Sequence, residues 1–249
     1  MTEATLSAGE QTAADRAIRD LILVLADSKR LLGTRYAEWI LGAPELETGI
    51  ACASMAQDEW GHARLLYALL KEFGEDVDRL EHGREPSEYC NLEVLDRAPE
   101  SWPEFVIVNA LVDIALTIQL EALTDSSHAP LRQRVGKLID EERFHAAHAL
   151  AWARRLGTTA DGMAALARAL DAAMPVVQRW FGAEGAHLRA LWLQRIQPVL
   201  VAADRTALAG ELPDFVGFNP RTRRVSTTGP DAATIKHVRG DKNRAFLMD

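Results

Sequence analysis

Residues 55–70, MAQDEWGHARLLYALL, decide how this 249-residue chain folds. Glu59 and His62 are three positions apart, so on a helix they share one face with Met55 and Leu66. A helix face of this kind is turned toward a core, where an ionised carboxylate is costly unless a cation or a metal ion neutralises it. The stretch therefore predicts a long buried helix with a polar centre.

The same helical spacing of apolar residues extends over most of the chain. It covers residues 15–41, 45–73, 102–123, 131–156, 161–181 and 184–209, with Pro198 expected to kink or split the last helix. Residues 74–101 show no sustained period and separate two helical hairpins. Two hairpins joined by one long crossover predict an all-α, ferritin-like four-helix bundle, with extra C-terminal helices. We expect this bundle domain over residues 1–210 and an irregular tail over residues 211–249.

Composition narrows the class of protein. The net charge of −8 disfavours nucleic-acid binding. The first 20 residues have no apolar core typical of a secretory signal, and no apolar run approaches membrane-spanning length. Cys52 and Cys90 form no CxxC motif, which favours free thiols in a reducing compartment. We expect a cytoplasmic protein with neither nucleic acid nor membrane as a partner.

The motif E-x-x-H occurs three times. Glu59 with His62 and Glu142 with His145 lie in mid-helix on matching helices of the two hairpins. The third copy, at residues 184–187, lies near a helix start between two glycines and has no mirrored partner, so we expect it to have a structural role and no metal. A carboxylate-bridged di-metal centre takes E-x-x-H from two helices and one carboxylate from each of the other two.

Hairpin geometry selects the two remaining carboxylates, because residues at one height on antiparallel helices are equidistant from the turn. Residue 43 lies halfway between Asp27 and Glu59, and the segment DSSHAP lies halfway between Asp113 and Glu142. The rival glutamates Glu38 and Glu121 fit less well and lie nearer helix ends. The two aspartates also have apolar neighbours at helical spacing. We therefore favour the aspartates, and the glutamates remain the alternatives.

The predicted metal ligands combine carboxylates with imidazoles, a donor set that suits iron and also manganese. Four carboxylates would neutralise two divalent ions, which would explain why the anions are buried. The alternative is a core ion network without metal, in which Arg64 or Arg143 supplies the positive charge. The full predicted ligand set is Asp27, Glu59, His62, Asp113, Glu142 and His145.

Other side chains near the motifs have possible supporting roles. Asp58 and Glu141 each precede a ligand glutamate, and they are expected either to orient an imidazole on a neighbouring helix or to face solvent. Thr117 lies one turn after Asp113, where it would either relay a proton as a catalytic residue or simply pack. Trp60 and Phe144 lie inside the two motifs and are expected in the core.

Three segments together resemble the bacterial multicomponent phenylacetyl-CoA epoxidase family: AQDEWGHARLLY (56–67), LVDIALTIQLEAL (111–123) and DEERFHAAHALAWARRLG (140–157). That family has two related ferritin-like subunits. QDE-x-GH, VD and EE-x-FH motifs mark the catalytic one, and these segments match them. The structural one, which has lost most metal ligands, is similar in length and in its LG-x-R-x-x-EW stretch, matched by residues 32–39. The resemblance covers about residues 20–185, and Asp27 departs from the glutamate expected on the first helix.

The resemblance implies a di-iron monooxygenase that activates O2 to epoxidise or hydroxylate an aromatic or unsaturated acyl thioester, carried on CoA or on a carrier protein. A reductase would supply electrons, and the chain would form a homodimer or a heterodimer with a related helical subunit. The alternatives are a non-catalytic scaffold subunit of such an oxygenase and a ferritin-like metal-binding protein.

Overall fold

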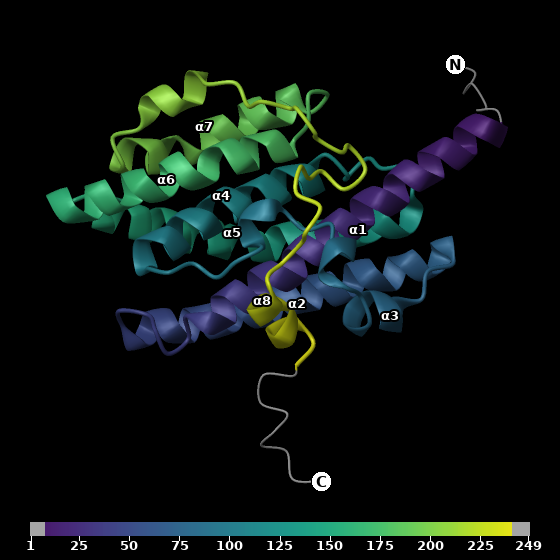
Figure 1. Cartoon of the computed structure of the whole chain (residues 1–249), viewed down its shortest axis with the longest axis horizontal. Helices are drawn as coiled ribbons and strands as arrows, with labels where there is room; N and C mark the ends of the chain where they lie inside the picture. Colours follow the sequence, from purple (N-terminus) through teal and green to yellow (C-terminus); the bar gives the residue numbers. More distant parts are fainter. Residues whose placement is uncertain (1–7, 241–249) are drawn as a thin grey trace, which may run out of the picture.

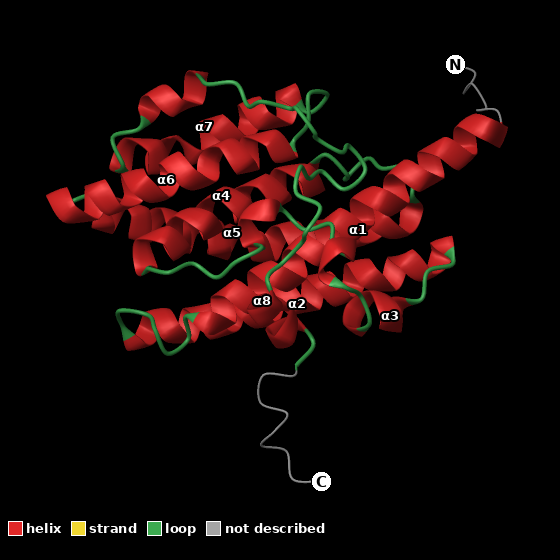
Figure 2. Ribbon diagram, viewed as in Figure 1, coloured by secondary structure: helices red, strands yellow, loops and turns green. Residues whose placement is uncertain are grey.

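The computed structural model of the protein describes residues 8–240; the first seven residues and the last nine of the predicted tail lie outside them. Figure 2 shows helices joined by loops, and among the described residues the β-type pairing is one isolated bridge, between Asn219 and Arg224. The expected all-α class is therefore confirmed.

Two helical hairpins form the bundle, as the sequence predicts. Helix α1 (Ala8–Glu38) packs along α2 (Leu46–Leu69), and α4 (Trp102–Glu121) packs along α5 (Ala129–Leu156). The hairpins meet through contacts of α2 with α5 and of α1 with α4, so the four inward faces enclose one core (Figure 1). This arrangement is the ferritin-like bundle.

The crossover between the hairpins is largely irregular, as expected, with a short helix α3 (Val77–His82) and several 3₁₀ turns. Gly74 ends the first hairpin with a positive φ of 79°, a backbone conformation that glycine adopts without steric cost. Ser101 begins the second hairpin, because its side chain accepts a hydrogen bond from the backbone N–H of Glu104. Local turn chemistry thus sets where each hairpin ends and begins.

Two further helices, α6 (Ala160–Trp180) and α7 (Ala186–Ala202), pack on the second hairpin and cover α4. Helix α4 is long and apolar enough to cross a membrane by length and composition, which corrects the expectation that no run approaches that length. Its most apolar window is 83% buried inside the bundle, so the apolarity is that of a central core helix. Helix α7 continues through Pro198 without splitting and ends at Ala202 rather than near residue 209.

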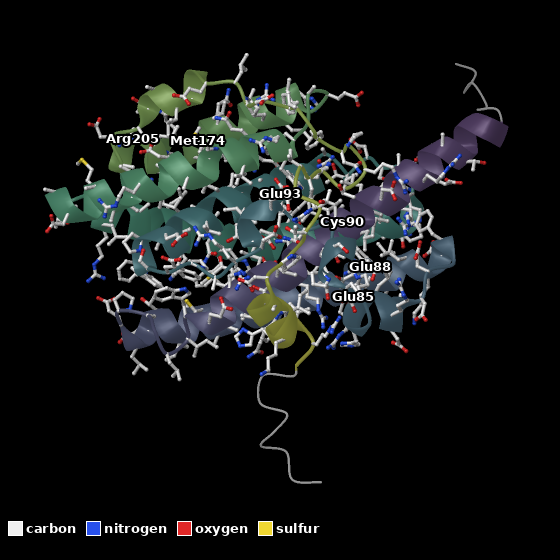
Figure 3. All side chains as sticks on the ribbon, in the orientation of Figure 1. Glu85, Glu88, Cys90, Glu93, Met174 and Arg205 are labelled. Carbon is white, nitrogen blue, oxygen red and sulfur yellow. The ribbon has the colours of Figure 1, made fainter. Side chains whose placement is uncertain are left out.

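The C-terminal segment is not irregular throughout, since it contains helix α8 (Ala232–Val238), which contacts α1 (Figure 1). The segment crosses the bundle on the way. Glu93 accepts a hydrogen bond from the backbone N–H of Val225, 2.8 Å away, and Asp96 pairs with Arg224 at 2.5 Å. Glu93 lies beside this part of the chain in Figure 3. The crossover loop therefore anchors the C-terminal segment.

Candidate metal centre

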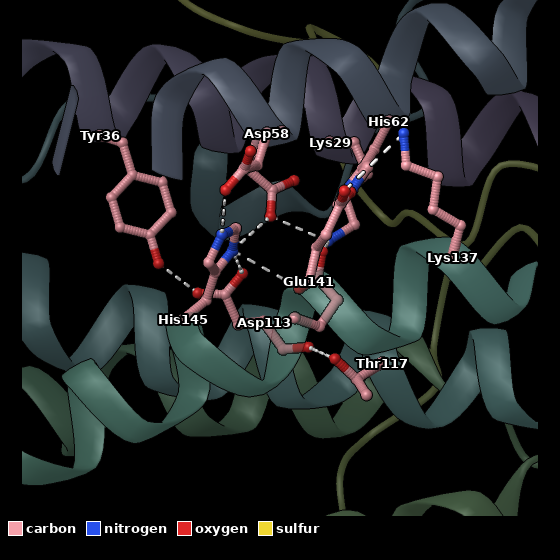
Figure 4. A network of polar contacts seen from close by, with 11 residues as sticks. Lys29, Tyr36, Asp58, His62, Asp113, Thr117, Lys137, Glu141 and His145 are labelled. Atoms are coloured by element: carbon pink, nitrogen blue, oxygen red, sulfur yellow. Dashed lines mark hydrogen bonds and ion pairs between the residues drawn. The ribbon is translucent and has the colours of Figure 1, made fainter. Parts of the chain in front are cut away.

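Four of the six predicted ligands meet at one point in the core, where Glu59, Asp113, Glu142 and His145 each offer a ligand atom within 4.8 Å of the others. Each of the four has a fully buried side chain. They come from three helices, α2, α4 and α5, and they form the carboxylate–histidine cluster drawn in Figure 4. Asp113 and Glu142, which are equidistant from the turn of their hairpin, therefore lie side by side in the bundle.

His62 borders the cluster. Its Nδ1 lies 3.0 Å from Oε1 of Glu142, and its Nε2 lies 2.6 Å from Oε2 of Glu141. Asp58 makes the reciprocal contact in the other direction, with its Oδ2 3.4 Å from Nε2 of His145 (Figure 4). Each imidazole is thus oriented by a carboxylate on the facing helix, which is the first of the two roles considered for these acidic residues.

Asp27 does not join the cluster. Its carboxylate pairs with the buried guanidinium of Arg84, with one Oδ2–Nη1 distance of 2.9 Å. It also accepts hydrogen bonds from the Tyr67 hydroxyl, at 2.5 Å, and from the backbone N–H of Cys90, at 2.7 Å. Burial of Asp27 is therefore explained by a separate ion pair that ties α1 to the crossover loop.

Helix α1 instead contributes Lys29 to the cluster. Its Nζ lies 2.9 Å from Oε1 of Glu59 and 2.5 Å from Oε1 of Glu142, and the side chain is fully buried. Residues two positions apart on an α-helix are separated by about 200° around its axis, so Asp27 and Lys29 face opposite sides. The bundle thus places an ammonium group where the di-metal pattern requires a carboxylate.

Tyr36, two helical turns after Lys29, donates a hydrogen bond to Asp113. Burial, reinforced by the Asp113 charge, holds the pKa of the Tyr36 hydroxyl well above its usual value, so it stays a donor. In the part of the chain that the structure describes, no hydrogen-bond donor reaches three buried carboxylate oxygens of the cluster, namely Glu59 Oε2, Asp113 Oδ1 and Glu142 Oε2. These oxygens are the part of the cluster with unused capacity for a cation.

The cluster approaches charge balance with protein groups alone. Burial disfavours charge on His145, but Asp113 and Glu59 outweigh it and raise its pKa to about 11. Burial acts likewise on His62, yet contacts with Glu142 raise its pKa. Burial and the nearby Glu142 raise the pKa of Glu59 to about 7. Lys29 and the His145 imidazolium therefore offset two of the cluster's three carboxylates, and partial protonation of Glu59 near neutral pH reduces the charge of the third.

The residues do not fit two divalent ions. Two such ions and the Lys29 ammonium would bring five positive charges against the three fully buried carboxylates of Glu59, Asp113 and Glu142. Asp58 and Glu141 contact the imidazoles but are partly exposed, so solvent screens their charges. Excess buried charge of one sign is strongly disfavoured in a low-dielectric interior. One divalent ion with Lys29 would match three carboxylates if both imidazoles were neutral, and the three unpaired oxygens leave ligands for it. The donor set thus suits at most one ion.

The rival glutamates lie outside the cluster. Glu38 binds Arg35, with an Oε1–Nη1 distance of 2.8 Å, and Glu121 binds Arg195 at 2.6 Å. Arg64 and Arg143, the counter-ions considered from the sequence, have exposed side chains. The positive charge next to the carboxylates comes from Lys29 instead.

The structure also places Thr117, the two aromatic residues inside the motifs and the third E-x-x-H motif. The Thr117 hydroxyl donates to the backbone oxygen of Asp113 at 2.8 Å, and the residue also lines a small cavity beside Glu142. Trp60 and Phe144 are 42% and 56% exposed, so the expectation that both lie in the core was wrong. Successive residues of an α-helix are separated by about 100° around its axis. Trp60 follows the buried Glu59 and Phe144 precedes the buried His145, so both side chains point away from the buried face. Residues 184 and 187 of the third motif are exposed.

Sequence reasoning missed Lys29 and Tyr36. Hairpin spacing could have indicated Lys29 as well as Asp27. Residue 44 is halfway between Lys29 and Glu59, residue 43 is halfway between Asp27 and Glu59, and both lie in the hairpin turn. Equal distance from a turn fixes height along the bundle but leaves open which side of the helix faces inward. Arg84, which pairs with Asp27, lies in the irregular crossover, where no periodicity indicates a position.

Fold and cluster together define a ferritin-like helical bundle with a carboxylate–histidine core contributed by both hairpins. The chain belongs to the phenylacetic acid catabolic protein family, whose model matches residues 1–237. Two relatives are components of 1,2-phenylacetyl-CoA epoxidase from Escherichia coli strain K12. The chain is 29% identical over 141 residues to the C component, a match that covers 56% of this chain and 57% of the relative. It is 31% identical over 112 residues to the A component, covering 43% of this chain and 35% of that relative. These matches span little more than half of one relative and about a third of the other.

Proposed function

We propose that the chain is a non-catalytic helical subunit of a multicomponent oxygenase of the phenylacetyl-CoA epoxidase type. Family membership and the similarity to two components named for that enzyme support the general kind of function. The observation that carries the non-catalytic role is Lys29, whose Nζ lies 2.5 and 2.9 Å from two core glutamates. In the two-metal pattern that position on the first helix belongs to a carboxylate.

The lysine acts twice against a di-metal site. It takes the place of one of the four carboxylates that two divalent ions need, and it adds a positive charge that repels them. A lysine ammonium binds carboxylate oxygens as a donor of three hydrogen bonds, so it competes with a metal for Oε1 of Glu59 and of Glu142. The network is therefore better suited to a permanent protein cation than to exchangeable iron.

A structural purpose for the network follows from its position. Lys29 and Tyr36 come from α1, Glu59 from α2, Asp113 from α4 and Glu142 from α5. All four helices of the bundle thus place charged or hydrogen-bonding side chains in one cluster. Buried polar groups that must be paired penalise alternative helix registers, and we infer that the network fixes how the hairpins align.

A second candidate is the catalytic di-iron monooxygenase acting on an aromatic or unsaturated acyl thioester. Two observations favour it: both E-x-x-H motifs, Glu59 with His62 and Glu142 with His145, are present, and a cavity of about 230 Å³ reaches Glu142. Thr117 lines this cavity and would be the candidate proton relay. This candidate requires Lys29 to leave the cluster and a carboxylate to replace it.

Co-purification separates the two candidates. The tagged chain would be isolated from its natural host, with iron measured for the free chain and for any complex containing a related helical subunit. A non-catalytic subunit should show iron only in the complex, and it should not consume O2 with phenylacetyl-CoA and a reductase on its own. Stoichiometric di-iron and substrate-dependent O2 consumption by the isolated chain would support the second candidate.

A further inference from the structure

A hollow of about 450 Å³ lies between the ends of α4 and α6, the start of α7 and the C-terminal segment. Its apolar wall contains Phe181, Leu188, Phe215 and Phe218, and none of the cluster residues lines it. Phe218 packs against Gly182, where an added Cβ would lie 3.4 Å from the Phe218 ring. The size is within the range of small-molecule pockets, which are mostly apolar with a few polar groups.

Arg223 provides the charged group of this hollow. One Nη1–H donates to Oε1 of Gln119 at 2.7 Å, and the guanidinium lies over the ring of Trp180, 4.7 Å from its centroid. A guanidinium has five N–H donors, so one neutral acceptor leaves most of them unused. Among residues 8–240, no carboxylate pairs with Arg223 in the structure.

The two arginines nearest to Arg223 in sequence both have carboxylate partners. Arg221 pairs with Asp20 at 2.8 Å, and Arg224 pairs with Asp96 at 2.5 Å. Burial without a compensating anion lowers the pKa of Arg223 to about 10, so the side chain is still charged at neutral pH. Its backbone also has a positive φ of 56°, a conformation that costs free energy in a non-glycine residue.

We propose that this hollow binds a small aromatic monocarboxylate, with its carboxylate on Arg223 and its ring among the phenylalanines. A guanidinium fork matches a carboxylate in a bidentate manner, and the Trp180 ring already holds the plane of Arg223 in place. Phe181, Phe215 and Phe218 supply apolar and edge-to-face contacts for an aromatic ring. This proposal rests on Arg223 and the hollow, independently of the role of the core cluster.

The remaining charges favour a ligand with one negative charge. Glu184 lines the same hollow and its side chain is exposed. A second negative charge on the ligand, as in a phosphate monoester, would face this carboxylate and gain no additional cation. The site therefore distinguishes a monocarboxylate from phosphate.

Isothermal titration calorimetry of the full-length wild-type protein at pH 7 measures the affinity for each ligand class. Benzoate and phenylacetate are the probes, with benzamide as the neutral isostere and inorganic phosphate as the multiply charged anion. We expect at least one aromatic carboxylate to bind about ten-fold or more tightly than benzamide, a margin of about 1.4 kcal/mol, with no competition from phosphate. The proposal is overturned if neither carboxylate binds more tightly than benzamide, or if phosphate binds preferentially.

Arg223→Gln tests the assigned residue, with Arg221→Gln as the matched control, since it removes an equal charge two positions away. Affinity for the carboxylate should fall about ten-fold or more in Arg223→Gln and stay within about two-fold of wild type in the control. Unchanged affinity in a folded Arg223→Gln protein would refute the assignment. If that variant does not fold, the wild-type affinity for the tighter-binding carboxylate relative to benzamide still decides the question.

Discussion

Replacing Lys29 with methionine tests the core network, because methionine fills a similar volume and removes only the ammonium group. Glu59 and Glu142 would keep their fully buried positions but lose the cation that lies 2.9 and 2.5 Å from them. Removing one partner from a buried ion pair costs about 3–5 kcal/mol, since the other charge is left uncompensated. We expect the free energy of unfolding to fall by about 4 kcal/mol, equivalent to a melting temperature lower by on the order of 10 °C.

The loss should depend on pH. Burial and the nearby Glu142 already raise the pKa of Glu59 to about 7 against the opposing effect of Lys29, so removing the ammonium raises this pKa further. A group whose folded pKa is raised contributes stability at low pH that disappears as the pH rises through the folded pKa. The deficit of Lys29→Met relative to wild type should therefore be larger at about pH 8 than at about pH 5.5.

Urea unfolding followed by helical circular dichroism measures both effects, with EDTA present so that metal ions do not contribute. Lys137→Met is the control, since its side chain is 69% exposed and the carboxylate that it pairs with is 3.8 Å away. An exposed pair of this kind contributes about 0–1 kcal/mol. A Lys29→Met loss as small as that of the control, without pH dependence, would refute the network.

Three further predictions concern other parts of the chain. Asp27→Asn should lower the free energy of unfolding, measured in urea, by about 3 kcal/mol, because Arg84 stays buried without its anion. Metal binding should stay unchanged, and loss of metal without loss of stability would contradict this prediction. Cys52 and Cys90 should react with a disulfide reagent at about pH 8 only after denaturation, because burial raises the pKa of both thiols to about 12. Fast reaction of Cys52 in the native protein would contradict this prediction. Gly182→Ala should cost about 1–2 kcal/mol in urea unfolding, because its φ is 71°; an unchanged midpoint would argue against a strained turn.

The fold was predictable because long helices with short turns leave few arrangements. Apolar spacing located both hairpins and the crossover, and the repeated E-x-x-H motif located the height at which Glu59 and Glu142 meet. The end of α1 could also be placed, because Gly42 and Pro44 follow it. These features depend on residues close in sequence, which is where periodicity is informative.

The choice between Asp27 and Lys29 was not settled by such patterns. Both lie at suitable heights on α1, and which one faces inward depends on contacts from distant segments. Arg84 in the crossover binds Asp27 on one side of the helix, while Glu142 of α5 binds Lys29 on the other. Side-chain pairing between segments far apart in the sequence decides the rotation of α1, and only the folded structure displays it.

Iron stoichiometry in wild type and Lys29→Glu decides whether Lys29 replaces a metal ligand. Both proteins would be loaded anaerobically with Fe(II), desalted and analysed for iron, with Lys29→Met as the variant that removes the ammonium without adding a ligand. We predict that wild type does not hold two ions, and that Lys29→Glu, which completes the four carboxylates, gains about two per chain. About two iron ions bound to wild type, lost when Lys29 becomes glutamate or methionine, would contradict the non-catalytic role and identify Lys29 as part of a working di-iron centre.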